Sequence, residues 1–140
     1  MCGIAGILHY DGEPVVREDL VKMTDAIAHR GPDGYGHWED GPVGFGHRRL
    51  SILDPSQSGK QPMSTNDGRY VISYNGEVYN YIDLKGELEK KGYRFKSETD
   101  TEVVLNSLAE WGTSIISEFN GMFAFAVWDR KEKTLLLARD

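Results

Sequence analysis

The feature that most constrains the fold is an almost wholly apolar run at residues 122–129, near the end of the chain. The run is far shorter than the roughly 20 apolar residues that cross a membrane, and turn-forming residues bound it, so it is typical of a buried strand. A charged turn at residues 130–133 follows, and residues 134–139 are predicted to return as the hairpin partner. Because hairpin partners run antiparallel, this pair favours antiparallel sheets.

The spacing of apolar residues predicts the other elements. Period-two alternation indicates a strand over residues 43–48 that continues to Asp54, and residues 69–74 are rich in β-branched and aromatic side chains, which indicates a strand ending at Asn75-Gly76-Glu77. Spacings of three and four predict helices over residues 18–29, 81–91 and 100–111. Thr99 and Glu102 fit a capping box at the start of the third helix. We also expect a buried first strand over residues 4–8, a short strand at 93–96 and a helical piece at 114–119.

This mixture of hairpins and interspersed helices predicts an α+β fold with antiparallel sheets. A chain of 140 residues is long enough for one domain, covering residues 1–140. The chain stops directly after a predicted strand, at Arg139-Asp140, without a polar tail. We therefore expect a piece that is truncated at its C-terminus.

The overall charge and the cysteine count exclude several classes of protein. A net charge of −6 without a basic cluster argues against a nucleic-acid surface. No apolar run is long enough for a membrane span, so no membrane partner is expected. One cysteine in the chain rules out an internal disulfide framework, which favours a reducing compartment and a cytoplasmic location.

That one cysteine, Cys2, directly follows the initiator methionine. If Met1 is removed, Cys2 carries a thiol with a reference pKa of about 8.5 and a free α-amine with a reference pKa of about 7.7–8.0. A nucleophile and its own base then share one residue, which is a recognised way to activate a thiol. The competing interpretation is a small apolar residue that happens to lie near a terminus.

Three further polar features have the chemistry that a small amino acid substrate would need. Arg49 supplies a fork for a carboxylate, Asp100 an anion for an ammonium group, and Asn75 with Gly76 two donors for an oxyanion. Each also has a plain structural interpretation: a surface charge, a first-turn acid favoured by the helix dipole, and a turn. Spacing along the chain does not show whether these residues converge.

Two other kinds of site fit the sequence less well. The four histidines, His9, His29, His37 and His47, have spacings that fit no zinc-ligand motif, so no metal site is predicted. A Cys–His pair with His47 as the base is chemically feasible, but it leaves the terminal position of Cys2 unexplained.

Six segments, in order, resemble the glutaminase domain of class II glutamine amidotransferases, in the N-terminal-nucleophile hydrolase superfamily, and more narrowly that of glutamine-hydrolysing asparagine synthetases. They are MCGIAG at 1–6, HRGPDG at 29–34, HRRLSI at 47–52, YNGEVYN at 74–80, ETDTE at 98–102 and NGMFAFA at 120–126. The resemblance covers the whole chain and implies an αββα sandwich of antiparallel sheets.

The resemblance also implies roles for individual residues. Cys2 would attack the side-chain amide of glutamine, with its α-amine relaying the proton, and Asn75 and Gly76 would form the oxyanion hole. Arg49 would bind the substrate carboxylate, Asp100 would bind its ammonium group, and Glu77 would help to hold that end. The loop at 30–34 would border the pocket. The products would be glutamate and ammonia.

In such families the ammonia passes to a C-terminal synthetase domain that uses ATP and Mg²⁺ to make asparagine from aspartate. This ligase part is absent from residues 1–140, so the domain itself is expected to need no cofactor, with glutamine, the missing synthetase domain and a homodimer as the candidate partners. Two alternatives stay open. The chain is the glutaminase half of a related amidotransferase with another acceptor, or it is a non-catalytic truncated module that retains Met1.

Overall fold

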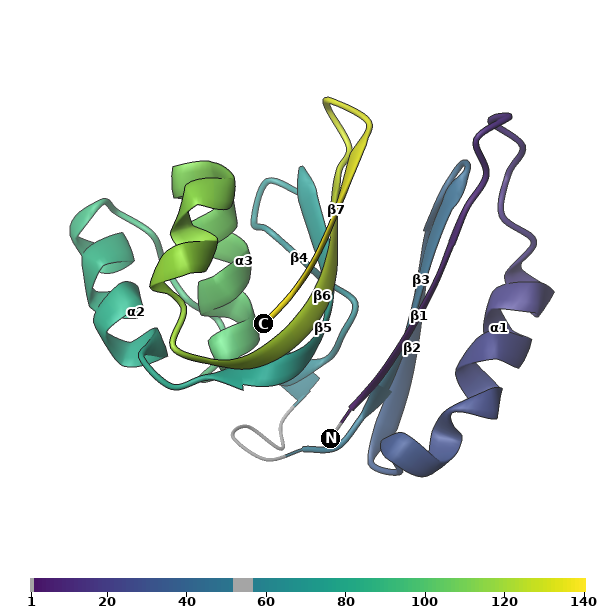
Figure 1. The fold of residues 1–140 in the computed structure, drawn as a ribbon, viewed down its shortest axis with the longest axis horizontal. Coiled ribbons are helices and arrows are strands. Elements are labelled where there is room, and N and C mark those ends of the chain that lie inside the picture. Colours follow the sequence, from purple (N-terminus) through teal and green to yellow (C-terminus); the bar gives the residue numbers. More distant parts are fainter. Residues whose placement is uncertain (1, 52–56) are drawn as a thin grey trace.

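The structure is a computed structural model that describes residues 2–51 and 57–140. Two antiparallel sheets lie face to face (Figure 1). The first has the order β1-β3-β2 and the second the order β4-β5-β6-β7. The strands are β1 (Gly3–Leu8), β2 (Gly34–Asp40), β3 (Val43–Arg49), β4 (Met63–Ser64), β5 (Tyr70–Val78), β6 (Gly121–Asp129) and β7 (Thr134–Arg139).

Helices cover the outer face of each sheet, which makes the expected αββα sandwich. Helix α1 (Arg17–Ala26) packs on the first sheet, while α2 (Tyr81–Lys90) and α3 (Asp100–Trp111) lie on the second (Figure 1). Short 3₁₀ turns complete the secondary structure: η1 (Ala28–Arg30), η2 (Gln57–Gly59) and η3 (Gly112–Glu118). Within the described ranges, no helix combines the length and the apolarity that crossing a bilayer requires.

Apolar side chains fill two layers of the sandwich. The larger cluster lies between α3 and the second sheet and includes Ile72, Tyr74 and Phe125. A smaller cluster of Val43, Phe45, Val71 and Trp128 lies between the two sheets. These residues alternate along their strands with residues that face the other way, as a two-faced sheet requires.

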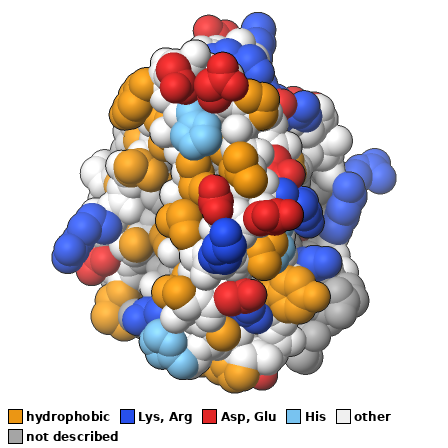
Figure 2. Space-filling model, turned by 90° about the vertical axis from the view of Figure 1, so that its right-hand side faces the viewer, with side chains coloured by type: hydrophobic (Ala, Val, Ile, Leu, Met, Phe, Trp, Pro, Cys, Tyr) orange, Lys and Arg blue, Asp and Glu red, His pale blue; other side chains and the backbone are white. Residues whose placement is uncertain are grey.

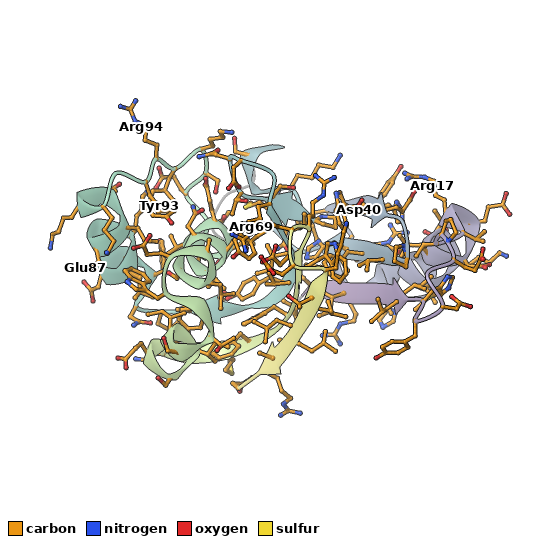
Figure 3. The ribbon with its side chains drawn as sticks, turned by 90° about the horizontal axis from the view of Figure 1, so that it is seen from above. Arg17, Asp40, Arg69, Glu87, Tyr93 and Arg94 are labelled. Carbon is orange, nitrogen blue, oxygen red and sulfur yellow. The ribbon has the colours of Figure 1, made fainter. Side chains whose placement is uncertain are left out.

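Hydrogen bonds also join the two sheets. Ser73 donates its hydroxyl to the carbonyl oxygen of Gly46 (3.3 Å). Arg130, in the turn between β6 and β7 of the second sheet, donates to Asp40 of β2 in the first sheet (3.1 Å). Figure 3 shows Asp40 near the junction of the two sheets. On the outer face seen in Figure 2, acidic and basic side chains are interspersed and form no patch of one sign.

Several predicted elements are confirmed. The hairpin of β6 and β7 forms with the expected turn, and α2 and α3 each lie within a residue of their predicted bounds. Gly92 and Gly112 follow these helices with φ of 95° and 68°, a conformation that glycine adopts without strain. The Thr99 hydroxyl caps α3 by accepting from the Glu102 N–H (3.4 Å).

Other predictions are wrong. Residues 93–96 form no strand, because the carboxylate of Glu102 binds the N–H groups of Lys96 (3.0 Å) and Ser97 (2.7 Å) where a strand partner would be needed. This also means that Glu102 does not close the predicted capping box. Helix α1 ends at Ala26, and a 3₁₀ turn takes the place of its last predicted turn.

Four strands differ from the prediction. β5 does not end before Asn75 but continues through Val78, since β6 pairs with it along its full length. β1 is an edge strand and is mostly half-buried rather than fully buried. β2 was not predicted at all. The strand over residues 43–48 ends at Arg49 as β3, and the part of its predicted continuation at residues 52–54 lies outside the described residues.

Candidate active site

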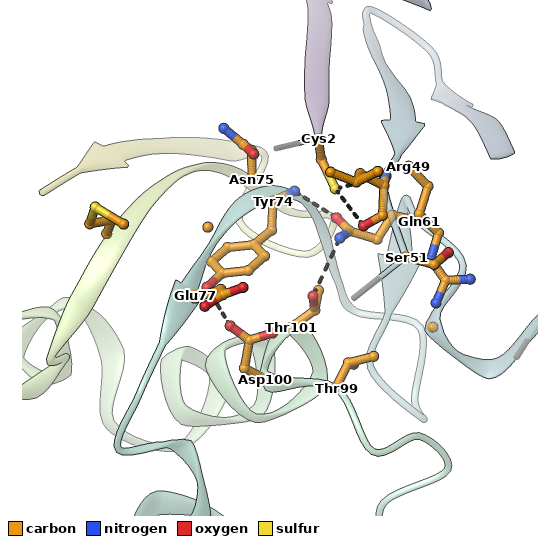
Figure 4. Close-up of a pocket in the computed structure, with 14 residues that line it drawn as sticks. Cys2, Arg49, Ser51, Gln61, Tyr74, Asn75, Glu77, Thr99, Asp100 and Thr101 are labelled. Carbon is orange, nitrogen blue, oxygen red and sulfur yellow. Dashed lines mark hydrogen bonds between the residues drawn. The ribbon is translucent and has the colours of Figure 1, made fainter. Parts of the chain in front are cut away.

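One pocket of about 220 Å³ brings together all six residues that the sequence pointed to (Figure 4). These are Cys2, Arg49, Asn75, Gly76, Glu77 and Asp100. They come from the start of β1, the end of β3, the second half of β5 and the first turn of α3. Pockets for drug-sized ligands occupy about 300–1,000 Å³, so this one suits a smaller molecule.

Cys2 lies where β1 begins, and its sulfur points towards the backbone that follows β3. The N–H of Leu50 donates to the Cys2 Sγ atom (3.3 Å), and Sγ lies 3.6 Å from the Leu50 carbonyl oxygen. The Arg30 side chain donates to the Cys2 carbonyl oxygen (3.0 Å). Met1, on which the α-amine of Cys2 depends, lies outside the described residues.

The predicted oxyanion-hole residues lie on β5, and strand geometry decides where their donors point. In an antiparallel strand, alternate residues direct their N–H and C=O groups to the same side. The N–H of Tyr74 donates to the Gln61 side chain and that of Val78 donates to Asp100, on the side away from β6. The N–H of Gly76, midway between them, therefore faces the same side, where the pocket lies.

The opposite strand agrees with this assignment. Phe123 of β6 is the cross-strand partner of Gly76. Its N–H donates to Asp140 (3.1 Å) and its carbonyl oxygen accepts from the Asp140 N–H (3.0 Å), so both groups face away from β5. The N–H of Gly76 is thus directed at the pocket rather than into the ladder.

Gly76 also has no room for a side chain. A Cβ atom there would lie 2.6 Å from the Phe123 Cα atom and 2.8 Å from its Cβ atom. Asn75 points its side chain to the face that Ser73 uses to reach the first sheet, which is the side of Cys2. Figure 4 shows Asn75 and Cys2 on the same side of β5, opposite Asp100.

The far end of the pocket is acidic. The Asp100 carboxylate is 5% exposed and accepts from the Tyr74 hydroxyl (2.6 Å) and the Val78 N–H (2.9 Å). Burial raises the pKa of Asp100, and the negative charge of Glu77 adds to that rise, while the two hydrogen bonds oppose it. Burial, and then the Asp100 charge, raise the pKa of the Tyr74 hydroxyl, which therefore stays protonated as a donor. Two neighbouring carboxylates make this end suited to a cation.

The opposite end is basic. Arg49 ends β3 and lines the pocket beside Gly59 of the η2 turn. A Cβ atom added at Gly59 would come within 3.0 Å of the Arg49 Cζ atom and 3.0 Å of the Thr99 Cγ2 atom. The absence of a side chain at Gly59 is therefore what leaves room for the guanidinium group. The pocket thus has a cationic and an anionic end, and Cys2 and Gly76 also line it.

Some lining residues were not found from the sequence. Tyr74, Gln61, Thr99, Thr101 and Leu50 all line the pocket. Tyr74 looks like an ordinary strand aromatic, and Gln61 lies in a polar loop, so neither carries a signal before the fold is known. The loop at residues 30–34 does not line the pocket itself. It supports the wall instead, because Arg30 binds Cys2 and Asp33 accepts from the Ser51 N–H (2.8 Å).

The histidines do not form the alternative sites. His47 is fully buried, and its Nε2 atom lies 3.0 Å from the carbonyl oxygen of Tyr74 rather than at the sulfur of Cys2. Burial lowers the pKa of His47 to about 4. Among residues 2–51 and 57–140, no cluster of three or more histidine, cysteine and acidic side chains is placed to hold a metal ion.

Comparison with known proteins agrees with the resemblance seen in the six segments. Glutamine-hydrolyzing asparagine synthetase 1 of Bacillus subtilis is 46% identical over 143 residues, covering 100% of this chain and 22% of that protein. Amidase chry2 of Gibberella zeae is 39% identical over 152 residues, covering 100% of this chain and 22% of that protein. The chain therefore spans about a fifth of the length of these relatives.

The fold also has a counterpart of known structure. Glutamine phosphoribosylpyrophosphate amidotransferase from B. subtilis superposes with a TM-score of 0.75 at 22% identity, covering 98% of this chain and 37% of that one. At that identity the likeness speaks for the fold alone. The family model described as a glutamine amidotransferase domain matches residues 1–140. The chain belongs to the glutamine amidotransferase domain family.

Proposed function

We propose that the chain hydrolyses the side-chain amide of glutamine, with Cys2 as the nucleophile. The observation that carries this proposal is the convergence of Cys2, the Gly76 N–H, Arg49 and Asp100 on one small pocket. A free amino acid has a carboxylate and an ammonium group, and the pocket offers one opposite charge for each. Arg49 is assigned to the carboxylate, and Asp100 with Glu77 to the ammonium group.

The reaction follows from these groups. Removal of Met1 frees the α-amine of Cys2, which takes the thiol proton as sulfur attacks the amide carbon. The carbonyl oxygen becomes an oxyanion that accepts hydrogen bonds from the Gly76 N–H and the Asn75 side chain. The α-ammonium group then returns the proton to the leaving nitrogen, the C–N bond breaks, and ammonia departs from a γ-glutamyl thioester. Water attacks the thioester, the amine takes its proton, and glutamate leaves as the thiol re-forms.

Nothing in this sequence of steps needs a cofactor, because sulfur, amine and backbone donors supply all the charge and proton movements. We assign the use of ammonia to the part of the protein beyond this domain. The identity to an asparagine synthetase supports ATP- and Mg²⁺-dependent formation of asparagine from aspartate, and hence a ligase, as the whole activity. The similarity to an amidase favours a second candidate, in which the ammonia goes to another acceptor. A cytoplasmic location and a homodimer stay predictions.

Glutamate release from glutamine tests the proposal, with Cys2→Ala as the variant. The purified protein should release glutamate and ammonia in equal amounts, and Cys2→Ala should release neither. The intact mass of the unaltered protein should be lower than that of the full sequence by one methionine residue. The alternative of an inactive module predicts a retained Met1 and no glutamate from either protein. Equal release by the two proteins would show that Cys2 is not the nucleophile.

A second measurement separates binding from chemistry. Glutamine binding to Cys2→Ala, followed by calorimetry, should persist because the charged ends of the pocket are intact. Asp100→Asn in the same background should weaken it, since the buried anion that faces the ammonium group is gone. Unchanged affinity in the Asp100→Asn variant would contradict the assignment of the acidic end.

A further inference from the structure

The edge of β5 beside the pocket is held by side chains instead of a strand. β4 has only two residues and pairs with β5 at Ile72 and Val71. Past that point, in the described part of the chain, side chains bind Tyr74. Its N–H donates to the Gln61 Oε1 atom (2.7 Å), its carbonyl oxygen lies 3.0 Å from the His47 Nε2 atom, and its hydroxyl donates to Asp100 (2.6 Å).

We propose that Gln61 is a positioning residue for the oxyanion hole. By taking the place of a ladder partner for the Tyr74 N–H, Gln61 sets the orientation of the next pocket-facing amide, that of Gly76. This inference rests on the proposed function, since it concerns the donor that the glutamine amide would meet.

Gln61 is itself held at several points. Its side chain is buried, and the Nε2 atom donates to the Thr101 hydroxyl (3.3 Å), one residue beyond Asp100. Its backbone carbonyl packs directly on Gly36 of β2, where any Cβ atom would collide with it. The amide of Gln61 therefore bridges β5 and α3, as the dashed lines in Figure 4 show, with little freedom to turn.

The distance over which Gln61 acts is short. Tyr74 and Gly76 are two residues apart on one strand, about 7 Å along it, and their N–H groups point to the same side. An oxyanion donor must lie about 2.7–3.1 Å from the oxygen at the moment of reaction. If the edge of β5 could tilt at Tyr74, the Gly76 N–H would no longer be held at this distance. The transition state would then be stabilised less, while substrate binding would change little.

The test compares the kinetics of three variants with those of the unaltered protein. Gln61→Met keeps an unbranched side chain but removes the acceptor, and it should lower kcat for glutamate release about 10-fold or more while KM changes less than about threefold. Gln61→Glu keeps an acceptor oxygen and should recover most of kcat. Thr101→Val removes only the hydrogen bond between the Gln61 amide and the Thr101 hydroxyl, and it should lower kcat less than Gln61→Met does.

Amide hydrogen exchange gives a readout that does not depend on turnover. In Gln61→Met the Tyr74 N–H should exchange faster, while the Val78 N–H, which Asp100 holds, should stay protected. Unchanged protection at Tyr74, or a raised KM at constant kcat, would overturn the positioning role, the second result making Gln61 a substrate contact. If the unaltered protein releases no glutamate, the proposed function fails together with this role. If it is active and Gln61→Met matches it, only the role of Gln61 fails.

Discussion

Removing the hydroxyl of Tyr74 should destabilise the protein in a pH-dependent way. Tyr74 and Asp100 are 2% and 5% exposed, and the hydroxyl donates to the carboxylate over 2.6 Å. Tyr74→Phe retains the ring and its packing but leaves the buried carboxylate with one donor fewer. A hydrogen bond to a charged group contributes about 1.5–3 kcal/mol, and a neutral pair about 0.5–1.5 kcal/mol.

The sign of the pH dependence follows from Asp100. Burial raises its pKa in the folded state above the ordinary value of 3.8. The stability that Asp100 contributes is therefore fully present below pH 3.8 and is lost as the pH rises through the folded-state pKa. The Tyr74 hydroxyl opposes that loss, because it binds the ionised form. Its removal should cost about 1.5–3 kcal/mol at pH 7.5 and less at about pH 4, where a larger share of the carboxyl is protonated.

Urea unfolding at the two pH values measures this difference. The buried Trp128 reports unfolding by its fluorescence. Tyr93→Phe is the matched control, because the Tyr93 hydroxyl also donates to a carboxylate, that of Glu110 (3.0 Å), but near the surface. Its loss should be small at both pH values. A Tyr74→Phe loss that is equal at both pH values, or larger in acid, would refute the reasoning.

Two other substitutions probe the pocket and the second sheet. Gly59→Ala should raise KM for glutamine several-fold with a smaller change in kcat, because the new methyl group displaces the guanidinium of Arg49; steady-state kinetics would contradict this if KM were unchanged. Arg69 lowers the pKa of Asp129 to about 2 by a two-point hydrogen bond (3.0 and 2.6 Å). The stability that this pair contributes is present above pH 3.8 and is lost as the pH falls towards 2. In Arg69→Gln the free energy of unfolding should therefore depend less on pH in this window. An acid titration identical to that of the unaltered protein would count against the pair.

Much of the fold could be predicted because local signals decide it. Glycines that follow α2 and α3 adopt positive φ, and the Thr99 cap marks where α3 begins. β2 escaped prediction because its glycines serve contacts distant in sequence. Gly36, for example, makes room for the backbone of Gln61. No local pattern contains that requirement.

The candidate site, like the fold, could be predicted from the sequence only in part. The sequence supplied the reactive types, Cys2, Arg49 and Asp100, because a resemblance across six segments picked them out. It could not show that they converge, since convergence depends on how β1, β3 and α3 meet around β5. The turn expected at Asn75-Gly76 proved to be strand, which matters chemically: a strand aims the Gly76 N–H by its alternation.

Because β4 is short, the edge of β5 beside the pocket keeps backbone groups that a longer strand would pair. Continuing the pairing of β4 with β5 from Ile72 to Gly76 would take four more residues and would satisfy this edge with ordinary ladder bonds, each contributing on the order of 1 kcal/mol. Those same bonds would consume the Gly76 N–H and fill the space in which a substrate carbonyl could lie. At this edge a more complete sheet and a working pocket exclude each other, so selection for stability alone would close the pocket.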